Sequence, residues 1–296
     1  MKRIFSVVLA LFCLFFSCTA PISIQTNESE PVIVIYGCLT NELKNQSIRI
    51  TSSSPYFYEK ENPAIRDAKV KLTSSNGREY TFVSNRNGLY ISQRRFSVVP
   101  GITYRLSIEV DFNNDGIIEF YEAETTTPPV VPVDSIEVKT IDIMGFRHHL
   151  LNVSMQDPIE EENYYLFKFV INDSISNYRI SDFIISNDLM YNGEYVNGAN
   201  ITFFEDGTDP NVIERNRDYE NVFMLKPGDR IRLQILNIEE GYYTFIGDCM
   251  REKYGENPFF GGPSSNIFTN LSNGAVGYFT SYCIYEKETV VPGERH

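Results

Sequence analysis

One twelve-residue stretch carries oxygen-bearing side chains at a regular spacing. Residues 111–122 read DFNNDGIIEFYE and match the calcium-loop pattern D-x-[DN]-x-[DN]-G-x5-E at every fixed position. Asp111, Asn113 and Asp115 present side-chain oxygens from alternate positions, the next glycine permits a sharp turn, and the carbonyl of Ile117 adds a backbone ligand. Calcium prefers oxygen ligands in such a loop, so the stretch predicts one structural Ca²⁺ ion.

The segments beside this loop are strand-like, whereas an EF-hand needs a helix on each side. Residues 103–110 alternate polar and apolar side chains, which is the period of a strand. On the following strand Glu119 and Glu122 point to opposite faces, so one ion favours only one of them. Hairpin calcium loops similar to those of integrin propellers use position nine, which favours Glu119 and leaves Glu122 in reserve. We expect a loop that stiffens a hairpin; an ion-free turn is the competing interpretation.

Motifs for catalysis are missing from the sequence. It contains no HExxH, GxSxG, P-loop or dinucleotide fingerprint. His148 and His149 are adjacent on an expected strand and face opposite sides, which disfavours a shared metal. The many acidic residues leave a glycosidase-type carboxylate pair open. We therefore expect no enzyme, with a glycan or peptide hydrolase as the weaker alternative.

Two tripeptides indicate possible modification sites. The sequence DSI occurs at 134–136 and at 173–175, and it matches a D-S/T-aliphatic site for O-glycosylation. Ser135 and Ser174 are therefore candidate acceptors. The competing interpretation is a strand start and a turn.

The loop at 257–274 is a candidate recognition surface. It is rich in Gly, Pro, Asn and Ser and holds Phe259, Phe260 and Phe268, where no regular core is expected. Exposed aromatic side chains on an irregular loop suit binding of a partner or ligand. Alternatively, these rings fold back over the end of a sandwich.

Short alternating segments between turn signals indicate a mainly β chain. Strands of this size and spacing predict two consecutive β-sandwich-like domains. The first covers 32–127, and a proline-rich linker follows at 128–134. The second covers 135–291 and includes one short α-helix at about 239–254, where acids stand in the first turn and apolar residues recur near helical spacing.

The first residues have the pattern of an export signal. Two basic residues precede an uncharged, mostly apolar run at 4–16, which is too short to span a bilayer comfortably. The following FFSC looks like a bacterial lipobox, which predicts a signal peptide at 1–17 and a lipidated Cys18, carrying for example palmitate, at the start of a tether at 18–31. An ordinary secretory signal cut near Ala20 is the alternative.

Charge and cysteine content exclude some functions. A formal net charge of −13 disfavours nucleic acid and anionic lipid as partners. Beyond Cys18, only Cys38, Cys249 and Cys283 are left for the exported chain, without CxxC or metal spacing. One disulfide among the three possible pairs, or three buried free thiols, is expected.

An ordered set of segments runs through almost the whole exported chain. The most specific are GCLTN, SSPYFY, DAKVKLTSSNGREYTF, GITYRLSIEV, PPVVPVDSI, ENYYLFKF, LKPGDRIRLQILNIEEGYYTFI and NPFFGGPSSNIFTNLSNGAVGYFTSY. Together they resemble a Bacteroidota outer-membrane lipoprotein family catalogued as domain of unknown function 4249. The first domain also looks like the transthyretin-like β-sandwich of carboxypeptidase-regulatory-like modules.

This resemblance implies an outer-membrane lipoprotein, often encoded beside TonB-dependent receptors, without an established activity. Members often carry acids directly after the lipidated cysteine, whereas TAPIS follows Cys18 here, so surface or periplasmic orientation stays open. We expect a non-enzymatic accessory that binds a ligand or partner for a TonB-dependent nutrient receptor, the nutrient itself being unidentified. A structural or adhesive envelope lipoprotein is the alternative.

Overall fold

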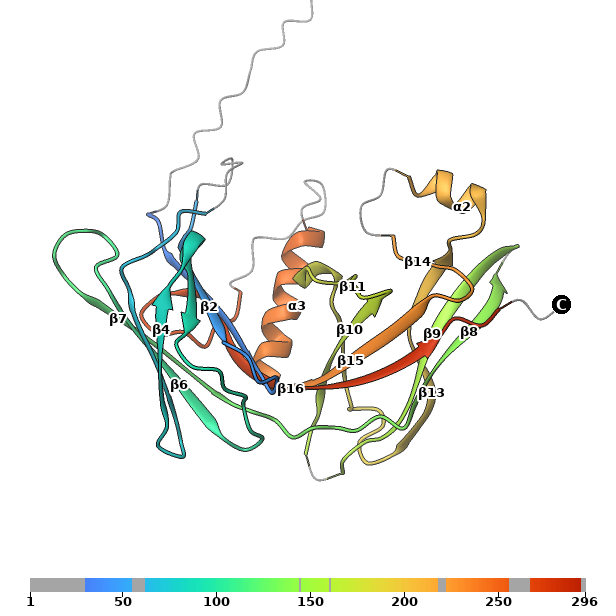
Figure 1. Ribbon diagram of the computed structural model, residues 1–296, viewed down its shortest axis with the longest axis horizontal. Coiled ribbons are helices and arrows are strands. Elements are labelled where there is room, and N and C mark those ends of the chain that lie inside the picture. Colours follow the sequence, from blue (N-terminus) through green and yellow to red (C-terminus); the bar gives the residue numbers. More distant parts are fainter. Residues whose placement is uncertain are drawn as a thin grey trace, which may run out of the picture.

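The computed structural model describes residues 30–54, 62–143, 145–159, 161–217, 222–255 and 267–293. The predicted signal peptide, Cys18 and most of the tether lie outside the described residues, as do Phe259 and Phe260. The described chain is mainly β and forms two sandwich-like parts, one on each side of a central helix, which confirms the predicted fold class (Figure 1).

The first part is one sheet that curls over a hydrophobic core. Its strands lie in the order β1-β2-β5-β4-β3-β6-β7, all antiparallel to their neighbours. The elements are β1 (Ile33–Thr40), β2 (Ser47–Ser52), β3 (Lys69–Ser74), β4 (Glu79–Ser84), η1 (Arg86–Gly88), β5 (Leu89–Ser92), β6 (Thr103–Val110) and β7 (Glu119–Thr126). Side chains alternate between buried and exposed along β6 and β7, as the sequence pattern predicts for strands with one solvated face.

The second part packs two sheets face to face. One sheet has the order β14-β13-β9-β8, and the other contains β10, β11, β12 and β15. The elements are β8 (Ser135–Ile143), β9 (Phe146–Gln156), β10 (Tyr164–Ile171), β11 (Ser174–Ile175), η2 (Ile180–Asp182), β12 (Ile184–Asn187), β13 (Tyr195–Asp206), α2 (Pro210–Arg215), β14 (Met224–Leu225), β15 (Arg230–Ile238) and α3 (Glu240–Gly255). Helix α3 coincides with the predicted helix to within one residue at each end, whereas the short α2 was not predicted.

A single long strand, β16 (Val276–Val290), belongs to both parts. Its first half pairs parallel with β1, from Val276 opposite Val34 to Tyr282 opposite Thr40. Its second half pairs antiparallel with β15, from Cys283 opposite Asn237 to Val290 opposite Arg230. The end of the chain therefore returns to its first strand, and one continuous sheet joins the two parts.

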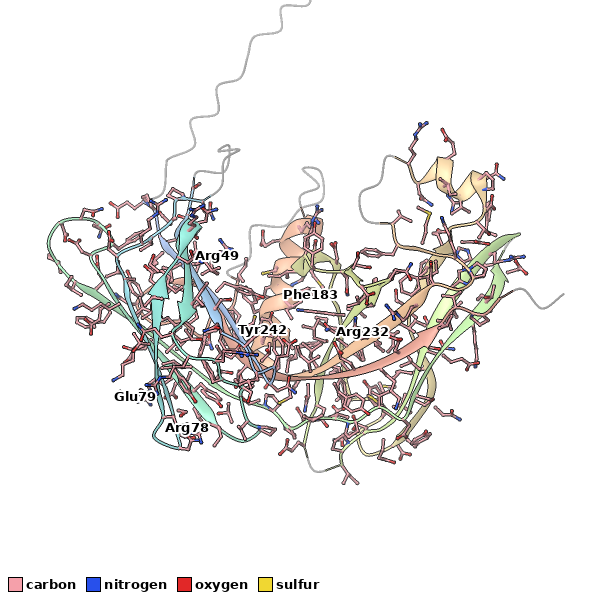
Figure 2. The ribbon with its side chains drawn as sticks, viewed as in Figure 1. Arg49, Arg78, Glu79, Phe183, Arg232 and Tyr242 are labelled. Atoms are coloured by element: carbon pink, nitrogen blue, oxygen red, sulfur yellow. The ribbon has the colours of Figure 1, made fainter. Side chains whose placement is uncertain are left out.

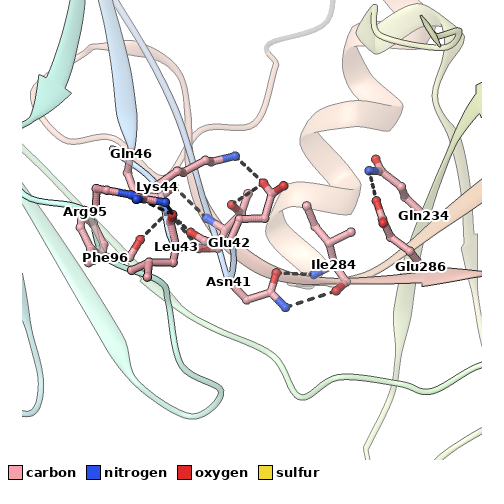
Figure 3. Close-up of polar contacts among 11 residues, drawn as sticks. Asn41, Glu42, Leu43, Lys44, Gln46, Arg95, Phe96, Gln234, Ile284 and Glu286 are labelled. Atoms are coloured by element: carbon pink, nitrogen blue, oxygen red, sulfur yellow. Dashed lines mark hydrogen bonds and ion pairs between the residues drawn. The ribbon is translucent and has the colours of Figure 1, made fainter. Parts of the chain in front are cut away.

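Asn41 stabilises the point where β16 changes partner (Figure 3). Its side-chain amide donates to the carbonyl of Ile284 at 3.2 Å, and its side-chain oxygen accepts from the Ile284 N–H at 3.0 Å. The side chain thereby satisfies backbone groups just beyond the last β1 pair.

A second asparagine joins β16 to β7 across the first part. The Asn270 amide donates to the carbonyls of Glu124, at 2.9 Å, and Phe279, at 2.8 Å, and its oxygen accepts from the Phe279 N–H at 3.1 Å. Close by, the hydroxyls of Thr125 and Thr127 lie 3.2 and 2.8 Å from the hydroxyl of Ser281. Side chains thus connect two strands that share no backbone ladder in the described chain.

Helix α3 covers the joined sheet where the two parts meet (Figure 1). Tyr242, in the first turn of this helix, is fully buried at the centre of the molecule (Figure 2), and its hydroxyl is 2.7 Å from that of Tyr36. The sequence of β15 reflects this cover: RIRLQ alternates, but the following ILNI is buried throughout. Strands covered on both faces read as continuous apolar runs, so the end of β15 marks the position of the helix.

Candidate functional site

A pocket opens between the two sheets of the second part, along the edge where β12 faces β13. Its volume is about 460 Å³. Its walls are mainly aliphatic and comprise Val153, Met155, Phe167, Ile184, Ile185, Ser186, Tyr191, Val196, Ala199, Asn200 and Ile201. Ligand pockets in proteins are concave, mostly apolar and of this size, with a few placed polar groups. This pocket is the strongest candidate for a binding site in the described chain.

Irregular backbone in β13 keeps this edge of the sandwich open. The pairing of β13 with β9 shifts between Val196 and Ala199 and again between Asn200 and Thr202. Within the first shift, between Val196 and Ala199, Gly198 has φ +69°, a conformation that favours glycine. Its N–H donates to the hydroxyl of Ser154 at 2.9 Å. Such bulges bend a strand and redirect its side chains. On the other sheet, the strand that faces β13 across the pocket is β12, which is only four residues long.

Two hydroxyl groups provide polar partners within the pocket. The Ser186 Oγ and the Tyr191 hydroxyl lie 3.2 Å apart. Burial raises the pKa of Tyr191, so this phenol is a neutral donor and acceptor at physiological pH. The amide of Asn200 is largely engaged, donating to the Asn152 side-chain oxygen at 3.2 Å and to the Thr202 carbonyl at 3.0 Å.

Two buried carboxylates lie behind the turns that carry Tyr191. Asp157 is 1% exposed and accepts from the Tyr165 hydroxyl at 2.5 Å and from the Gly193 N–H at 3.0 Å. Asp188 is 2% exposed and accepts from the N–H of Asn163 at 2.7 Å. Burial, followed by the bond to Asp157, raises the pKa of Tyr165. These bonds fix the turns between β12 and β13 and set a negative charge near the pocket.

The opposite edge of this sandwich holds a larger but polar pocket of about 640 Å³, beside β8. It is lined by Arg147 and His149, among others, and the Arg147 guanidinium is 3.8 Å from the carboxylate of Asp206. The His149 Nδ1 is 3.0 Å from the Thr140 hydroxyl, and the other ring nitrogen is buried without a described partner. Burial lowers the pKa of His149. His148 faces the other side of β9 beside Glu205, as strand alternation predicts.

The predicted calcium loop forms the turn between β6 and β7. Asp111 accepts from the N–H groups of Asp115 and Gly116, both at 3.0 Å, and Asp115 accepts from the N–H of Ile117 at 2.8 Å. Glu119 turns into the loop, where it accepts from the Phe112 N–H at 2.8 Å and the Asn113 amide at 3.1 Å. The described residues contain no group of three or more His, Cys, Asp or Glu side chains placed to hold a metal.

Each of these loop carboxylates keeps further lone pairs, so the oxygen-only donor set fits Ca²⁺ chemically. Glu122 is exposed on β7, and its backbone pairs with Ser272, away from the turn. The structure thus brings Asp111, Asn113, Asp115 and Glu119 into one turn and leaves Glu122 outside it. Calcium binding itself stays a prediction.

The other predicted site residues are scattered. Phe268 is 45% exposed; its N–H donates to Asp248 on α3 at 2.8 Å, and its ring centroid is 6.2 Å from that of Tyr278. This ring therefore packs partly against α3 and β16. Ser135 and Ser174 are both exposed, at the starts of β8 and β11, so modification of either stays a prediction.

All three described cysteines are free. Cys38 and Cys249 lie in the apolar cluster beneath α3, whereas Cys283 belongs to the core of the first part, on the other face of the sheet. Burial raises the pKa of Cys249 to about 11 and also raises that of Cys283, so both are poor nucleophiles at neutral pH.

Comparison with known proteins gives the family of the chain. A family model described as Domain of unknown function (DUF4249) matches residues 19–288. The chain belongs to this family. No curated protein matches it. Among solved structures, a two fibronectin type-III domain segment from chicken tenascin is 12% identical over 66% of this chain and 86% of its own, with a TM-score of 0.18, too low to support an argument.

The pocket was not predicted from the sequence. Its walls come from four strands and a turn, and most of them are ordinary core residues by type. The available signal was the segment YNGEYVNG, residues 191–198, because glycine inside a strand often marks a bulge.

Proposed function

We propose that this member of the DUF4249 family is a non-enzymatic binding lipoprotein of a Bacteroidota outer membrane. In this proposal Cys18 carries the lipid anchor, the pocket between β12 and β13 holds a ligand, and the protein assists a TonB-dependent nutrient receptor. The observation that carries it is the pocket itself: an apolar cavity of about 460 Å³ with a hydroxyl pair inside.

The anchor is supported by the first eighteen residues, a short apolar run that ends in a lipobox-like cysteine. No helix in the described part of the chain is long and apolar enough to cross a membrane. Since one acyl chain gives only marginal membrane binding, stable anchoring needs the several chains that a lipidated N-terminal cysteine carries.

The arrangement of the fold supports a binding role away from the anchor. Strand β1, which follows the tether, begins at the upper left of Figure 1. Strand β13 runs up to α2 at the upper right, so its first residues, which border the pocket, lie at the lower side. The turn before it exposes two apolar side chains, Leu189 at 78% and Met190 at 90%. Exposed apolar side chains beside a pocket suit contact with a partner.

The experiment is purification of the tagged, full-length protein from mildly solubilised outer membranes, with partners identified by mass spectrometry. We expect fatty-acid labelling at Cys18 and a TonB-dependent receptor in near-stoichiometric amount. The matched control is Cys18→Ala, which should lose the label and the membrane fraction. Labelled protein without any receptor would contradict the accessory role and favour a free-standing envelope protein.

A further inference from the structure

We propose that the pocket selects ligands with an aliphatic body and a polar end that is neutral or positively charged, and that it rejects carboxylates. This inference rests on the proposed function, because it names the ligand class for the same pocket.

The aliphatic body is inferred from the inner wall. Val153 and Met155 on β9 are each 1% exposed, and Phe167 on β10 is 2% exposed, so they form a dry floor between the two sheets. The side walls are branched aliphatic residues from β12 and β13. Transfer of each methylene of a ligand from water into such surroundings is favourable.

The polar end is inferred from the hydroxyl pair of Ser186 and Tyr191. The Ser186 Oγ lies 3.2 Å from both the Tyr191 hydroxyl and the Asn187 carbonyl, so the Ser186 O–H donates to that carbonyl and the Tyr191 O–H donates to Ser186. The Tyr191 oxygen keeps acceptor capacity for a donor group of a ligand. A ligand alcohol, amide or ammonium group finds a partner here without displacing a structural bond.

The charge preference is inferred from Asp157 and Asp188. Both are buried behind Tyr191, and after burial and the bond to Ser186 they are the next causes that shift the pKa of Tyr191, in the direction expected of nearby negative charge. The hydrogen bonds that they accept come from N–H groups and the Tyr165 hydroxyl, and the described residues show no Lys or Arg ion pair with either. A carboxylate entering the pocket therefore meets two uncompensated negative charges.

The experiment uses three probes with the same alkyl chain: octan-1-ol, octylammonium and octanoate. The reporter is the ¹³C-methyl NMR signal of Met155, which lines the pocket, and the control signal is that of Met250, a residue of α3 outside the pocket wall. We expect saturable shifts of Met155 but not of Met250. Octanoate should bind about tenfold more weakly than octan-1-ol or octylammonium, the effect of one like-charge repulsion in a half-buried site.

Two variants test the site and the charge separately. Ala199→Phe places a ring at the exposed mouth and should abolish the Met155 shift, whereas Asn197→Phe, on the same strand but outside the pocket wall, should preserve it. Asp188→Asn should narrow the affinity difference between octanoate and octan-1-ol, while Asp157 keeps part of it. The melting curve of Asp188→Asn shows whether this variant still folds. Titration of the wild-type protein with octanoate at rising salt tests the same charge repulsion without a variant.

The outcomes separate the two proposals. If octanoate binds as tightly as octan-1-ol, the charge preference is wrong while the pocket stands as a binding site. If none of the three probes shifts Met155, both the ligand class and the pocket's role in the proposed function are overturned.

Discussion

Replacement of Asn270 by alanine should destabilise the protein far more than its place in an irregular loop suggests. Its amide and oxygen make three hydrogen bonds, two with the backbone of Phe279 and one with the carbonyl of Glu124. Phe279 is fully buried, so its N–H and C=O lose their partner without gaining water. A buried polar group left unsatisfied costs about 1–3 kcal/mol. For two such groups and one exposed carbonyl we expect a loss of about 3 kcal/mol.

The assay is equilibrium urea unfolding of the wild type and Asn270→Ala, followed by tyrosine fluorescence and by circular dichroism. Because β16 belongs to both sandwiches, both probes should shift to lower urea together. Asn270→Asp isolates the donors: it keeps an oxygen for the Phe279 N–H but removes both N–H donations, so it should cost at least as much as alanine. The control is Asn211→Ala on exposed α2, expected within about 0.5 kcal/mol of wild type. A loss below about 1 kcal/mol for Asn270→Ala would refute the bridging role.

Three further perturbations follow from the structure. Gly277→Ala should lower the free energy of unfolding in urea by about 3 kcal/mol or more, because φ is +108° and a Cβ would lie 2.1 Å from the Ile35 carbonyl oxygen. Gly101→Ala is the control: φ is +76° but the space around a Cβ is open, so the loss should be only about 1–2 kcal/mol. Millimolar CaCl₂ should raise the melting temperature relative to chelator, and Glu119→Gln should remove the increase; identical wild-type curves would mean an ion-free turn. Since burial lowers the pKa of His149, the unfolded chain binds its proton first, so stability should fall as pH drops from about 7 through 6.5 toward 5. His149→Gln should flatten that slope, and an unchanged slope would contradict it.

The local pattern of the sequence carries much of the fold. Alternation over 103–110 and the acids at the start of 239–254 predict β6 and α3 because these signals depend on neighbours within one turn or strand. The opposite-face placement of Glu119 and Glu122 follows from the same rule. Each of these features is decided by the period of the chain itself.

The pairing of β16 with β1 could not be predicted in this way. The two strands are separated by more than two hundred residues. The alternation of polar and apolar side chains along a strand does not identify the strand with which it pairs. The two asparagines that complete the joint, Asn41 and Asn270, look like ordinary loop residues in the sequence. Their role depends on where tertiary structure leaves backbone groups unpaired.

The pocket escaped prediction for a related reason. It exists because two register shifts in β13 and a four-residue β12 leave the edge of the sandwich open. A cavity is the space that side-chain packing does not fill. The pattern of a single sequence shows which residues are apolar but not how closely their side chains pack.

The most direct test of the pocket as a working site is to identify what it holds in the cell. Wild-type protein and the Ala199→Phe variant would be purified gently from native membranes, with Asn197→Phe as the matched control, and small molecules released on denaturation would be measured by mass spectrometry. We predict a molecule with an aliphatic body, near one per chain, in the wild type and in the control but absent from Ala199→Phe. The same small-molecule content in all three would contradict the assignment of this pocket as the binding site.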